Sequence, residues 1–397
     1  MKLFEHEGKD LFEDFEIPVL KRVVVDKALA SQKEKDLSQS IPGSKWVVKA
    51  QTLSGKRGKR GLIKIVGKES LVSEEVNKLI GRDVDGEHIS KVLVEEAVDI
   101  THELFVSITY STKTRGPILL FSLQGGMEIE DMVVSEIPLR IGMDVPDLAT
   151  DDWHLVTGEQ NKEKLEAKVW NVIQKLWRLF QDKDLFLAEI NPLAITRTGD
   201  LVALDAKVVT DDAANFRQKW EFPVRNMFGT EKTWAEVESE KIDAEDHRGA
   251  VGRVYLDLPG DIGVIAAGGG ASLVAMDALV TYGLKPANYT EFSGNPPNYK
   301  VKRLTEIVLA KENLKGVILI GGKANFTDQV ETLSGFVEAL KEINPQYPIV
   351  VRRDGPRMEE AKAMLEKAAK ENGWDLVVFD STTSIIDAVR KLVELVK

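Results

Sequence analysis

Residues 186–207 read Phe-Leu-Ala-Glu-Ile-Asn-Pro-Leu-Ala-Ile-Thr-Arg-Thr-Gly-Asp-Leu-Val-Ala-Leu-Asp-Ala-Lys. Two runs rich in apolar residues flank Thr196-Arg-Thr-Gly-Asp200, a polar link that contains the glycine typical of a tight turn. The stretch therefore predicts an antiparallel hairpin with strands over 186–195 and 201–209. This pairing distinguishes the first half of the chain from the half that follows it.

The hairpin would place a carboxylate opposite an amide. Side chains alternate between the two faces of a strand, so Glu189 and Asn191 share one face. Asp205 and Lys207 do the same on the return strand. With a pivot near Thr198, Asn191 lies across from Asp205 at about 5 Å. Such hard oxygen donors suit Mg²⁺, which completes its shell with water and nucleotide phosphates. An ordinary amphipathic hairpin with its polar face in solvent explains the spacing equally well.

The second half alternates short Val- and Ile-rich runs with longer amphipathic patterns. From Asp261 onward the order is strand, helix, strand, which is typical of a doubly wound parallel sheet. The expected strands cover 261–267, 316–321, 348–352 and 375–379, and the expected helices cover 272–282, 298–310, 327–343, 359–372 and 385–396. The polar stretch 218–252 is the candidate linker. We therefore expect two domains, 1–240 and 245–397.

The composition excludes several classes of protein. The 397-residue chain has a formal net charge of −11, which disfavours binding to nucleic acid and to anionic membranes. It contains no cysteine, which excludes disulfides and thiolate metal sites, and its five histidines are too scattered for a zinc site. No segment approaches the roughly 18 apolar residues of a membrane span, and no leader sequence is evident. We expect a cytoplasmic protein.

A basic, glycine-rich loop follows a predicted strand over 45–50. The strand places Lys49 and Gln51 on one face, and the loop over 54–61 adds four cations: Lys56, Arg57, Lys59 and Arg60. Backbone N–H groups and cationic side chains of such a loop can close over phosphates. The spacing is not that of a Walker A loop. A solvated basic turn is the commoner explanation of such a run.

Acidic side chains accompany the next two predicted strands, over 91–95 and 104–110. Glu95 and Glu96 end the first strand, and Glu103 precedes the second. An extended segment here could bind a purine edge through its backbone, while a glutamate reaches a ribose hydroxyl. Surface glutamates are, however, more often merely solvated.

Glycines and polar residues gather where the strands of the second half end. Gly268-Gly-Gly-Ala-Ser272 leads from a strand into a helix, whose N-terminus offers N–H groups and the positive end of its dipole. Ligands of open α/β sheets bind at the carboxyl ends of the strands. We expect a site for a multiply charged carboxylate, built from Ser293, Asn325, Thr327, Arg352 and Arg353. Surface salt bridges would explain the two arginines, taken alone, equally well.

These motifs together resemble the ATP-grasp β subunits of the succinyl-CoA synthetase family. The matching segments of the first half are Val48–Gln51, Leu93–Phe105, Gln124–Glu130, Ala188–Leu193, Gly199–Lys207 and Asn215–Gln218. The segments similar to the citrate-binding domain of ATP-citrate lyase are Gly268–Ser272, Phe292–Gly294, Ala324–Thr327 and Val351–Arg353. The succinate branch of the family has Asn-Phe-Gly-Gly in the later turn and Gly-Gly-Arg-Gly-Lys in the phosphate loop. This chain departs from both.

The resemblance implies an α/β protein, with an N-terminal ATP-grasp domain followed by a flavodoxin-like, doubly wound parallel-sheet domain. The implied ATP-binding residues are Lys49, Lys56, Arg57, Gly58, Glu95, Val98 and Glu103. The implied Mg²⁺ ligands are Asn191 and Asp205. The implied catalytic residue is Glu189, which would face a phosphohistidine of a partner subunit. The implied citrate-binding residues are Gly269, Gly270, Ala271, Ser293, Gly294, Asn325, Thr327 and Arg353.

The implied reaction joins citrate, ATP and CoA. It passes through a phosphohistidine and citryl-phosphate to citryl-CoA, and in the complete lyase it yields acetyl-CoA, oxaloacetate, ADP and phosphate. The phosphohistidine, the CoA site and a citrate-synthase-like lyase module belong to a partner chain, so a hetero-oligomer is expected. A citryl-CoA synthetase subunit and an ADP-forming succinyl-CoA synthetase β subunit are alternatives. A nonenzymatic citrate or nucleotide sensor is an alternative of another class.

Overall fold

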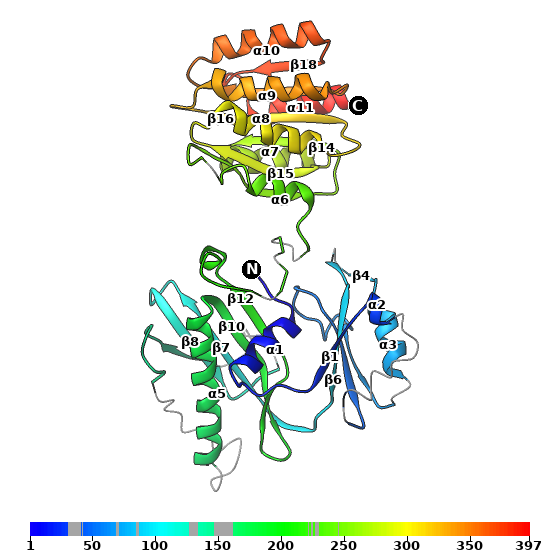
Figure 1. Ribbon diagram of the computed structural model, residues 1–397, viewed down its shortest axis with the longest axis vertical. Coiled ribbons are helices and arrows are strands. Elements are labelled where there is room, and N and C mark those ends of the chain that lie inside the picture. The colour runs from blue at the N-terminus through cyan, green and yellow to red at the C-terminus, as the bar shows by residue number, and fades with distance from the viewer. Residues whose placement is uncertain are drawn as a thin grey trace. The chain divides into compact units, whose positions relative to one another are not determined.

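The structure is a computed structural model (Figure 1) that divides the chain into two compact units, Met1–Thr230 and Glu231–Lys397. The described residues are 1–30, 41, 43–68, 71–84, 87–126, 134–146, 162–220, 222–223, 225–226, 230–244 and 246–397. The boundary lies before residue 240, where we expected the first domain to end. The reason is that α6 (Trp234–Glu240) packs on β13 (Ala250–Asp257) and therefore belongs to the second unit.

One antiparallel sheet of the first unit has the strand order β1-β6-β2-β3. Its strands are β1 (Arg22–Asp26), β2 (Trp46–Ala50), β3 (Ile63–Val66) and β6 (Lys91–Glu96). Helix α3 (Val72–Leu79) packs on it through Val72, Val76 and Leu79, which recur with the helical period. The short elements beside this sheet are α2 (Lys27–Ala30), β4 (Asp83–Val84) and β5 (Glu87–His88). Strands β2 and β6 confirm the predictions over 45–50 and 91–95.

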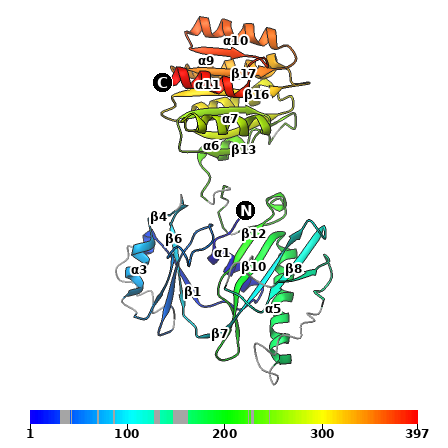
Figure 2. The same cartoon turned by 180° about the vertical axis from the view of Figure 1, so that it is seen from behind.

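The other sheet of the first unit has the order β11-β10-β7-β8-β9, with β12 also paired to β10. Its strands are β7 (Ile100–Ser111), β8 (Gly116–Ser122), β9 (Ser135–Pro138), β10 (Leu185–Thr196), β11 (Leu201–Ala203) and β12 (Lys207–Thr210). Helix α5 (Lys162–Asp182) packs on β7 and β10, and α1 (Glu5–Asp14) packs on β12 (Figure 2). The core between them includes Phe12, Trp177 and Ile190.

The hairpin pairs in the register that a pivot at Thr198 predicts. Leu193 lies opposite Ala203, and Glu189 lies opposite Lys207. Both pairs are centred on the same point of the chain, so the two strands keep one register from β11 into β12. The paired residues on either side of Asn191 and Asp205 therefore have the expected register.

The return strand of the hairpin is broken between β11 and β12, so our prediction of one continuous strand over 201–209 was wrong. At the break, the carbonyl of Leu204 accepts hydrogen bonds from the ammonium groups of Lys9 at 2.9 Å and Lys49 at 2.6 Å. The next residue, Asp205, accepts a hydrogen bond from the N–H of Ala206 at 2.8 Å. At this point the strand pairing is replaced by these hydrogen bonds, and Asp205 lies at the break.

The second unit contains a sheet of order β13-β15-β14-β16-β17-β18. Its remaining strands are β14 (Ile262–Ala267), β15 (Asn288–Ser293), β16 (Gly316–Lys323), β17 (Ile349–Asp354) and β18 (Leu376–Phe379). Strands β14 to β18 run parallel. When they are numbered 1 to 5 along the chain, their order across the sheet is 2-1-3-4-5, as in flavodoxin-like folds. This confirms the doubly wound fold. Strand β13 pairs antiparallel with β15, so the sheet is mixed and not wholly parallel as expected.

Helices cover both faces of this sheet (Figures 1 and 2). They are α7 (Gly269–Thr281), α8 (Asn298–Leu309), α9 (Gln329–Ile343), α10 (Met358–Asn372) and α11 (Ile385–Val396). One apolar core contains residues of α7 and α11, and the other contains residues of α8, α9 and α10. The strand order reverses between β14 and β16, which is the switch point where such sheets bind ligands. No helix among the described residues has the length and apolar character of a membrane span.

Candidate nucleotide and carboxylate sites

A pocket of about 730 Å³ in the first unit collects most of the expected nucleotide and metal residues. These residues come from the loop after β2, from β7, from β10 and from the break between β11 and β12. The expected residues that line the pocket are Lys56, Arg57, Gly58, Glu103, Glu189, Asn191 and Asp205. The structure therefore brings together segments that are widely separated in the sequence.

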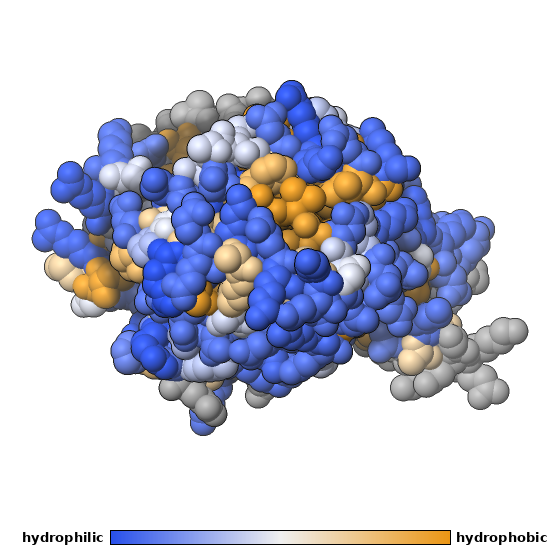
Figure 3. Space-filling model, turned by 90° about the horizontal axis from the view of Figure 1, so that it is seen from above, coloured by the Kyte–Doolittle hydropathy of each residue, from blue (hydrophilic) through white to orange (hydrophobic). Residues whose placement is uncertain are grey.

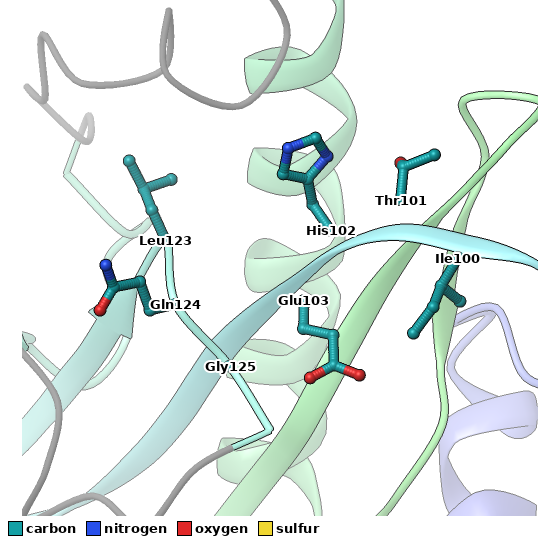
Figure 4. A pocket seen from close by; sticks show the side chains of 7 residues that line it. All are labelled: Ile100, Thr101, His102, Glu103, Leu123, Gln124 and Gly125. Atoms are coloured by element: carbon teal, nitrogen blue, oxygen red, sulfur yellow. The ribbon is translucent and has the colours of Figure 1, made fainter.

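Glu103 also lines a neighbouring pocket of about 560 Å³ (Figure 4). Its other lining residues are Ile100, Thr101, His102, Leu123, Gln124 and Gly125. Figure 4 shows the side chains of His102 and Glu103 pointing to opposite sides of β7. A Cβ atom at Gly126 would lie only 1.9 Å from a carboxylate oxygen of Glu103, so this glycine makes room for the side chain. The rest of the Gln124–Glu130 motif, residues 127–130, lies outside the described residues.

Two further residues expected at the nucleotide, Lys49 and Glu95, meet in a buried cluster of charges. The carboxylate of Glu95 is fully buried and pairs with Lys9 at 2.5 Å and with Lys49 at 2.8 Å. Glu5 of α1 pairs with the same two lysines, each at 2.8 Å, and with Arg57 at 2.6 Å. The side chain of Glu95 thus lies within this charge cluster, so a contact with a base would involve its backbone. Val98 follows β6 and is half-buried.

The charges of this cluster stabilise one another. Burial alone would raise the pKa of Glu5, but Arg57, Lys49 and Lys9 outweigh burial and hold that pKa well below its usual range. Burial opposes the charge of Lys49, yet Glu5 and Glu95 raise its pKa above the ordinary lysine value. Glu5 and Lys9 were not among the expected site residues. Their signal was an i, i+4 pair of opposite charges on a short helix that also carries apolar residues.

Arg57 turns inward from the basic loop, while Lys56, Gly58 and Lys59 are exposed. Its guanidinium donates to Asp205 at 2.8 Å and to the carbonyl of Ala50 at 3.3 Å, in addition to its ion pair with Glu5. A cationic side chain therefore lies directly against one of the expected metal ligands.

Asn191 and Asp205 face the same pocket and offer hard oxygen donors. The Asn191 carbonyl accepts the N–H of Gly126 at 2.8 Å, which fixes its orientation. One carboxylate and one amide oxygen fit the modest number of protein ligands that Mg²⁺ usually takes beside a nucleotide. In the described part of the chain, no three His, Cys, Asp or Glu side chains form a metal cluster. Water and phosphate oxygens would have to complete a shell here.

Glu189 is a mostly buried carboxylate on the pocket wall. It pairs with Lys207 at 3.4 Å and accepts a hydrogen bond from the Ser107 hydroxyl at 3.5 Å. Burial raises the pKa of Glu189, and Lys207 only partly opposes this effect. A carboxyl group with a raised pKa is suited to exchanging a proton with a neighbouring base.

A pocket of about 200 Å³ lies in the second unit at the carboxyl ends of β14 to β17. The expected carboxylate-binding residues that line it are Ser293, Gly294, Asn325, Thr327 and Arg353. Gly268 also lines it, and Gly269, Gly270 and Ala271 follow as the first residues of α7. The N-terminus of α7 thus begins beside the pocket, where its N–H groups favour an anion.

Arg353 is a buried cation whose hydrogen bonds go to neutral groups. Its guanidinium lies 5.7 Å from the ring centre of Phe292, and it donates to the side-chain carbonyl of Gln329 at 3.1 Å and to the carbonyl of Gly322 at 3.4 Å. Burial, together with the neighbouring charge of Arg352, lowers the pKa of Arg353 to about 10. A bound carboxylate would offset the free-energy cost of burying this positive charge.

Arg352 points elsewhere, although we grouped it with Arg353. It donates to the carbonyls of Gly321 at 2.5 Å and Thr383 at 3.0 Å, and is not among the residues that line the pocket. Successive residues of a strand face opposite sides, which explains why the two arginines separate. Arg352 anchors the loop after β18.

Two family models match the chain. A model described as "ATP-grasp domain" matches residues 2–195, and one described as "ATP citrate lyase citrate-binding" matches residues 230–395. The β subunit of ADP-forming succinate–CoA ligase from Rubrobacter xylanophilus is 31% identical over 100% of this chain and 99% of its own length. The corresponding subunit from Methanocaldococcus jannaschii is 32% identical over 99% of this chain and 100% of its own.

Solved structures of ATP citrate lyases are also similar. The enzyme from Methanothrix soehngenii, in complex with citrate and coenzyme A, aligns with a TM-score of 0.73 and 25% identity over 99% of both chains. The Methanosaeta concilii enzyme, a D541A mutant in complex with (3S)-citryl-CoA, has a fold that aligns with a TM-score of 0.70 and 24% identity over 98% of both chains.

Proposed function

Because the chain belongs to the family of succinate–CoA ligase β subunits and combines an ATP-grasp domain with a citrate-binding domain, we propose that it is the ATP- and citrate-binding subunit of an ATP-citrate lyase. Its reaction would convert citrate, ATP and CoA into acetyl-CoA, oxaloacetate, ADP and phosphate, together with a partner subunit. The pairing of one nucleotide pocket with one carboxylate pocket supports this proposal.

The first unit would bind ATP and Mg²⁺. Lys56 and Gly58 would contact the phosphates, Glu103 would lie at the sugar, and Asn191 and Asp205 would be the metal ligands. Bound Mg²⁺ would neutralise phosphate charge and orient the transferred group. Arg57 would exchange Asp205 for a phosphate oxygen when the nucleotide enters. Glu189, with its raised pKa, would hold or release a proton at the imidazole of the partner's phosphohistidine.

The second unit would bind citrate. Arg353 would pair with one carboxylate, while Asn325 and Thr327 would contact a second carboxylate or the hydroxyl group. The N-terminus of α7, starting at Gly269, would stabilise the phosphoryl group as it is delivered to citrate. These roles use the chain's own donors, all of which lie at the carboxyl ends of the parallel strands.

A partner subunit would carry the phosphohistidine, the CoA site and the lyase module. The surface in Figure 3 is largely hydrophilic but carries an apolar patch, and such patches mark contact sites. Helix α7 in addition exposes Leu273, Val274 and Val280. Because the phosphohistidine and the CoA site would belong to the partner, the chain alone should form no acyl-CoA in a coupled thioester assay. Turnover by a preparation that mass spectrometry shows to be free of any second chain would contradict the proposed division of labour.

Arg353 is the single observation that carries the citrate assignment. Citrate has up to three carboxylates, and a buried guanidinium bonded only to neutral groups suits such a ligand. The test is calorimetric titration of citrate, succinate and MgATP into the wild type, Arg353→Ala and the exposed control Arg357→Ala. Arg353→Ala should weaken citrate binding by at least about tenfold. MgATP binding should be unchanged, because the nucleotide pocket belongs to the first unit.

The second candidate is an ADP-forming succinate–CoA ligase β subunit, which the identity to those relatives favours. Tighter binding of succinate than of citrate by the wild type would establish that candidate instead. A citryl-CoA synthetase subunit would bind the same ligands, so it is separated from the lyase by the products of the assembled complex. Release of oxaloacetate indicates the lyase, and accumulation of citryl-CoA indicates the synthetase.

A further inference from the structure

Gln329, the first residue of α9, is fully buried and uses both ends of its side-chain amide. Its carbonyl oxygen accepts a hydrogen bond from Nε of Arg353 at 3.1 Å. Its amide nitrogen donates to the backbone carbonyl of Thr327 at 2.9 Å. One side chain thus joins the arginine on β17 to the loop that follows β16.

The same network reaches the loop after β15. The hydroxyl of Thr327 donates to the carbonyl of Gly294 at 2.6 Å, and the side-chain carbonyl of Asn295 accepts the N–H of Asp328 at 2.9 Å. Two loops beside the carboxylate pocket and strand β17 are therefore tied together. Gln329 is the member of this network that touches the guanidinium.

Glycine at position 355 makes room for the amide of Gln329. A Cβ atom added to Gly355 would lie 2.9 Å from its nitrogen and 3.0 Å from the carbonyl of Ala324. The hydrogen bonds to Thr327 and Arg353 hold the amide between these two residues, and the amide thereby orients the guanidinium. Gln329 thus holds Nε, the Gly322 carbonyl accepts from one outer nitrogen at 3.4 Å, and Arg353 in this orientation lines the pocket.

Nearby carboxylates are engaged elsewhere. Asp354 pairs with Ser381 and with Lys323, and Asp328 pairs with Arg357 and caps α9. The group that contacts Nε of Arg353 is therefore an uncharged amide. A glutamate in its place would provide the same acceptor but would also neutralise the cation.

We propose that Gln329 is the positioning residue of the carboxylate site: it orients Arg353 through Nε while leaving its positive charge for a ligand with several carboxylates. The inference rests on the proposed function, because citrate is that ligand. The proposal predicts that glutamate, a close isostere, weakens citrate binding although it preserves the acceptor, because its charge would neutralise that of Arg353.

The experiment uses the full chain with three substitutions. Gln329→Glu keeps the acceptor and adds a counter-charge, and Gln329→Met removes both hydrogen bonds at similar length. The exposed Gln346→Glu makes the same charge change elsewhere in the same unit. Calorimetry measures the binding of citrate and of MgATP, and thermal unfolding reports whether each variant folds. Both Gln329 variants should bind citrate at least about tenfold more weakly than the wild type, with Gln329→Glu the weaker of the two. Gln346→Glu should match the wild type.

Several outcomes overturn the inference. Citrate binding by Gln329→Glu at the wild-type level, or tighter than by Gln329→Met, would mean that only an acceptor for Nε is needed. If Gln329→Glu does not fold, Gln329→Met decides, and an unchanged citrate affinity refutes the positioning role. If the wild type itself does not bind citrate, the proposed function is refuted together with the inference. Weaker citrate binding by variants whose thermal unfolding matches that of the wild type supports the inference, because the second unit, which contains the carboxylate pocket, is then still folded.

Discussion

Arg57 contacts Asp205 across 2.8 Å, although the two residues are 148 positions apart in the chain. The contact joins the basic loop after β2 to the break in the hairpin. Glu5 holds the same guanidinium from the other side at 2.6 Å. Arg57 is thus a cation in direct contact with Asp205, while Lys56, Lys59 and Lys207 also line the pocket. We propose that a metal ion at Asp205 would compete with this ion pair.

Replacing Arg57 should change metal binding before any nucleotide is added. In Arg57→Gln, the affinity for Mn²⁺, used as a paramagnetic substitute for Mg²⁺, should rise by about tenfold, because loss of one charged hydrogen bond to Asp205 is worth roughly that much. The affinity for ATP should fall, since a phosphate contact is lost. Electron paramagnetic resonance of free Mn²⁺ measures the first effect. Lys59→Gln, an exposed cation of the same loop, is the control. Equal Mn²⁺ affinity in both variants and the wild type would show that Arg57 does not compete.

Glu5→Gln should destabilise the first unit strongly. The substitution leaves Arg57, Lys49 and Lys9 with one carboxylate fewer in a buried setting, and breaking a buried pair in this way costs about 3–5 kcal/mol. Urea unfolding of the first unit measures the loss. Because the pKa of Glu5 is held low, its contribution is present above the ordinary carboxyl range and is lost as the pH falls through the lowered value. The difference from the wild type should therefore shrink in acid. The exposed Glu16→Gln should have little effect, and an equal loss there would contradict the argument.

The hairpin and the second sheet could be predicted because their signals are local. The turn around Thr198 sets the register, so Asn191 and Asp205 follow by counting residues. The parallel strands of the second unit are apolar runs separated by amphipathic helices, and the helices around 298–310 and 359–372 lie within a residue or two of the prediction. Glycines and polar residues at the strand ends then mark one edge of the sheet.

The buried charges could not be predicted in the same way. Glu5, Lys9 and Glu95 look like surface residues in the sequence, because a charge is normally solvated unless it is paired. Their pairing depends on α1 packing against segments far along the chain. Gln329 gave no signal either, since its role depends on its contact with Arg353 on another strand. Helix α6 lies within the segment 218–252 that we read as a linker, and β13 begins at its end.

Glu189→Gln should make stability less dependent on pH. Burial raises the pKa of Glu189, so ionising the carboxyl group opposes folding, and Lys207 only partly compensates. The wild type should therefore lose stability relative to the glutamine variant as the pH rises above about 4.3, the ordinary glutamate value, until it passes the raised pKa. Thermal unfolding over that range measures the difference. Glu136→Gln, on the exposed part of β9, should show no such trend. A wild type that gains stability with rising pH relative to Glu189→Gln would mean that the ion pair with Lys207 dominates.

Gly321 should be as important for citrate binding as any charged residue of the site. A Cβ atom at this position would lie 2.1 Å from an outer nitrogen of Arg353 and 2.8 Å from the Cβ of Ala267. Gly321→Ala should therefore push the guanidinium away and weaken citrate binding by at least about tenfold. The added methyl group would also lie 2.9 Å from the backbone carbonyl of Ala267, so β14 would have to shift, and thermal unfolding must show that the second unit of this variant still folds.

The neighbouring Gly322→Ala is the matched control, because its added methyl group would meet no atom within 4 Å. Both substitutions remove the same conformational freedom from the unfolded chain, so they share that effect on stability. Calorimetry with citrate should separate them, with Gly321→Ala weakened and Gly322→Ala close to the wild type. MgATP affinity should be unchanged in both. Equal losses in the two variants would point to a methyl group blocking the pocket entrance. Unchanged citrate affinity in Gly321→Ala would show that the direction of the Arg353 guanidinium does not set the affinity.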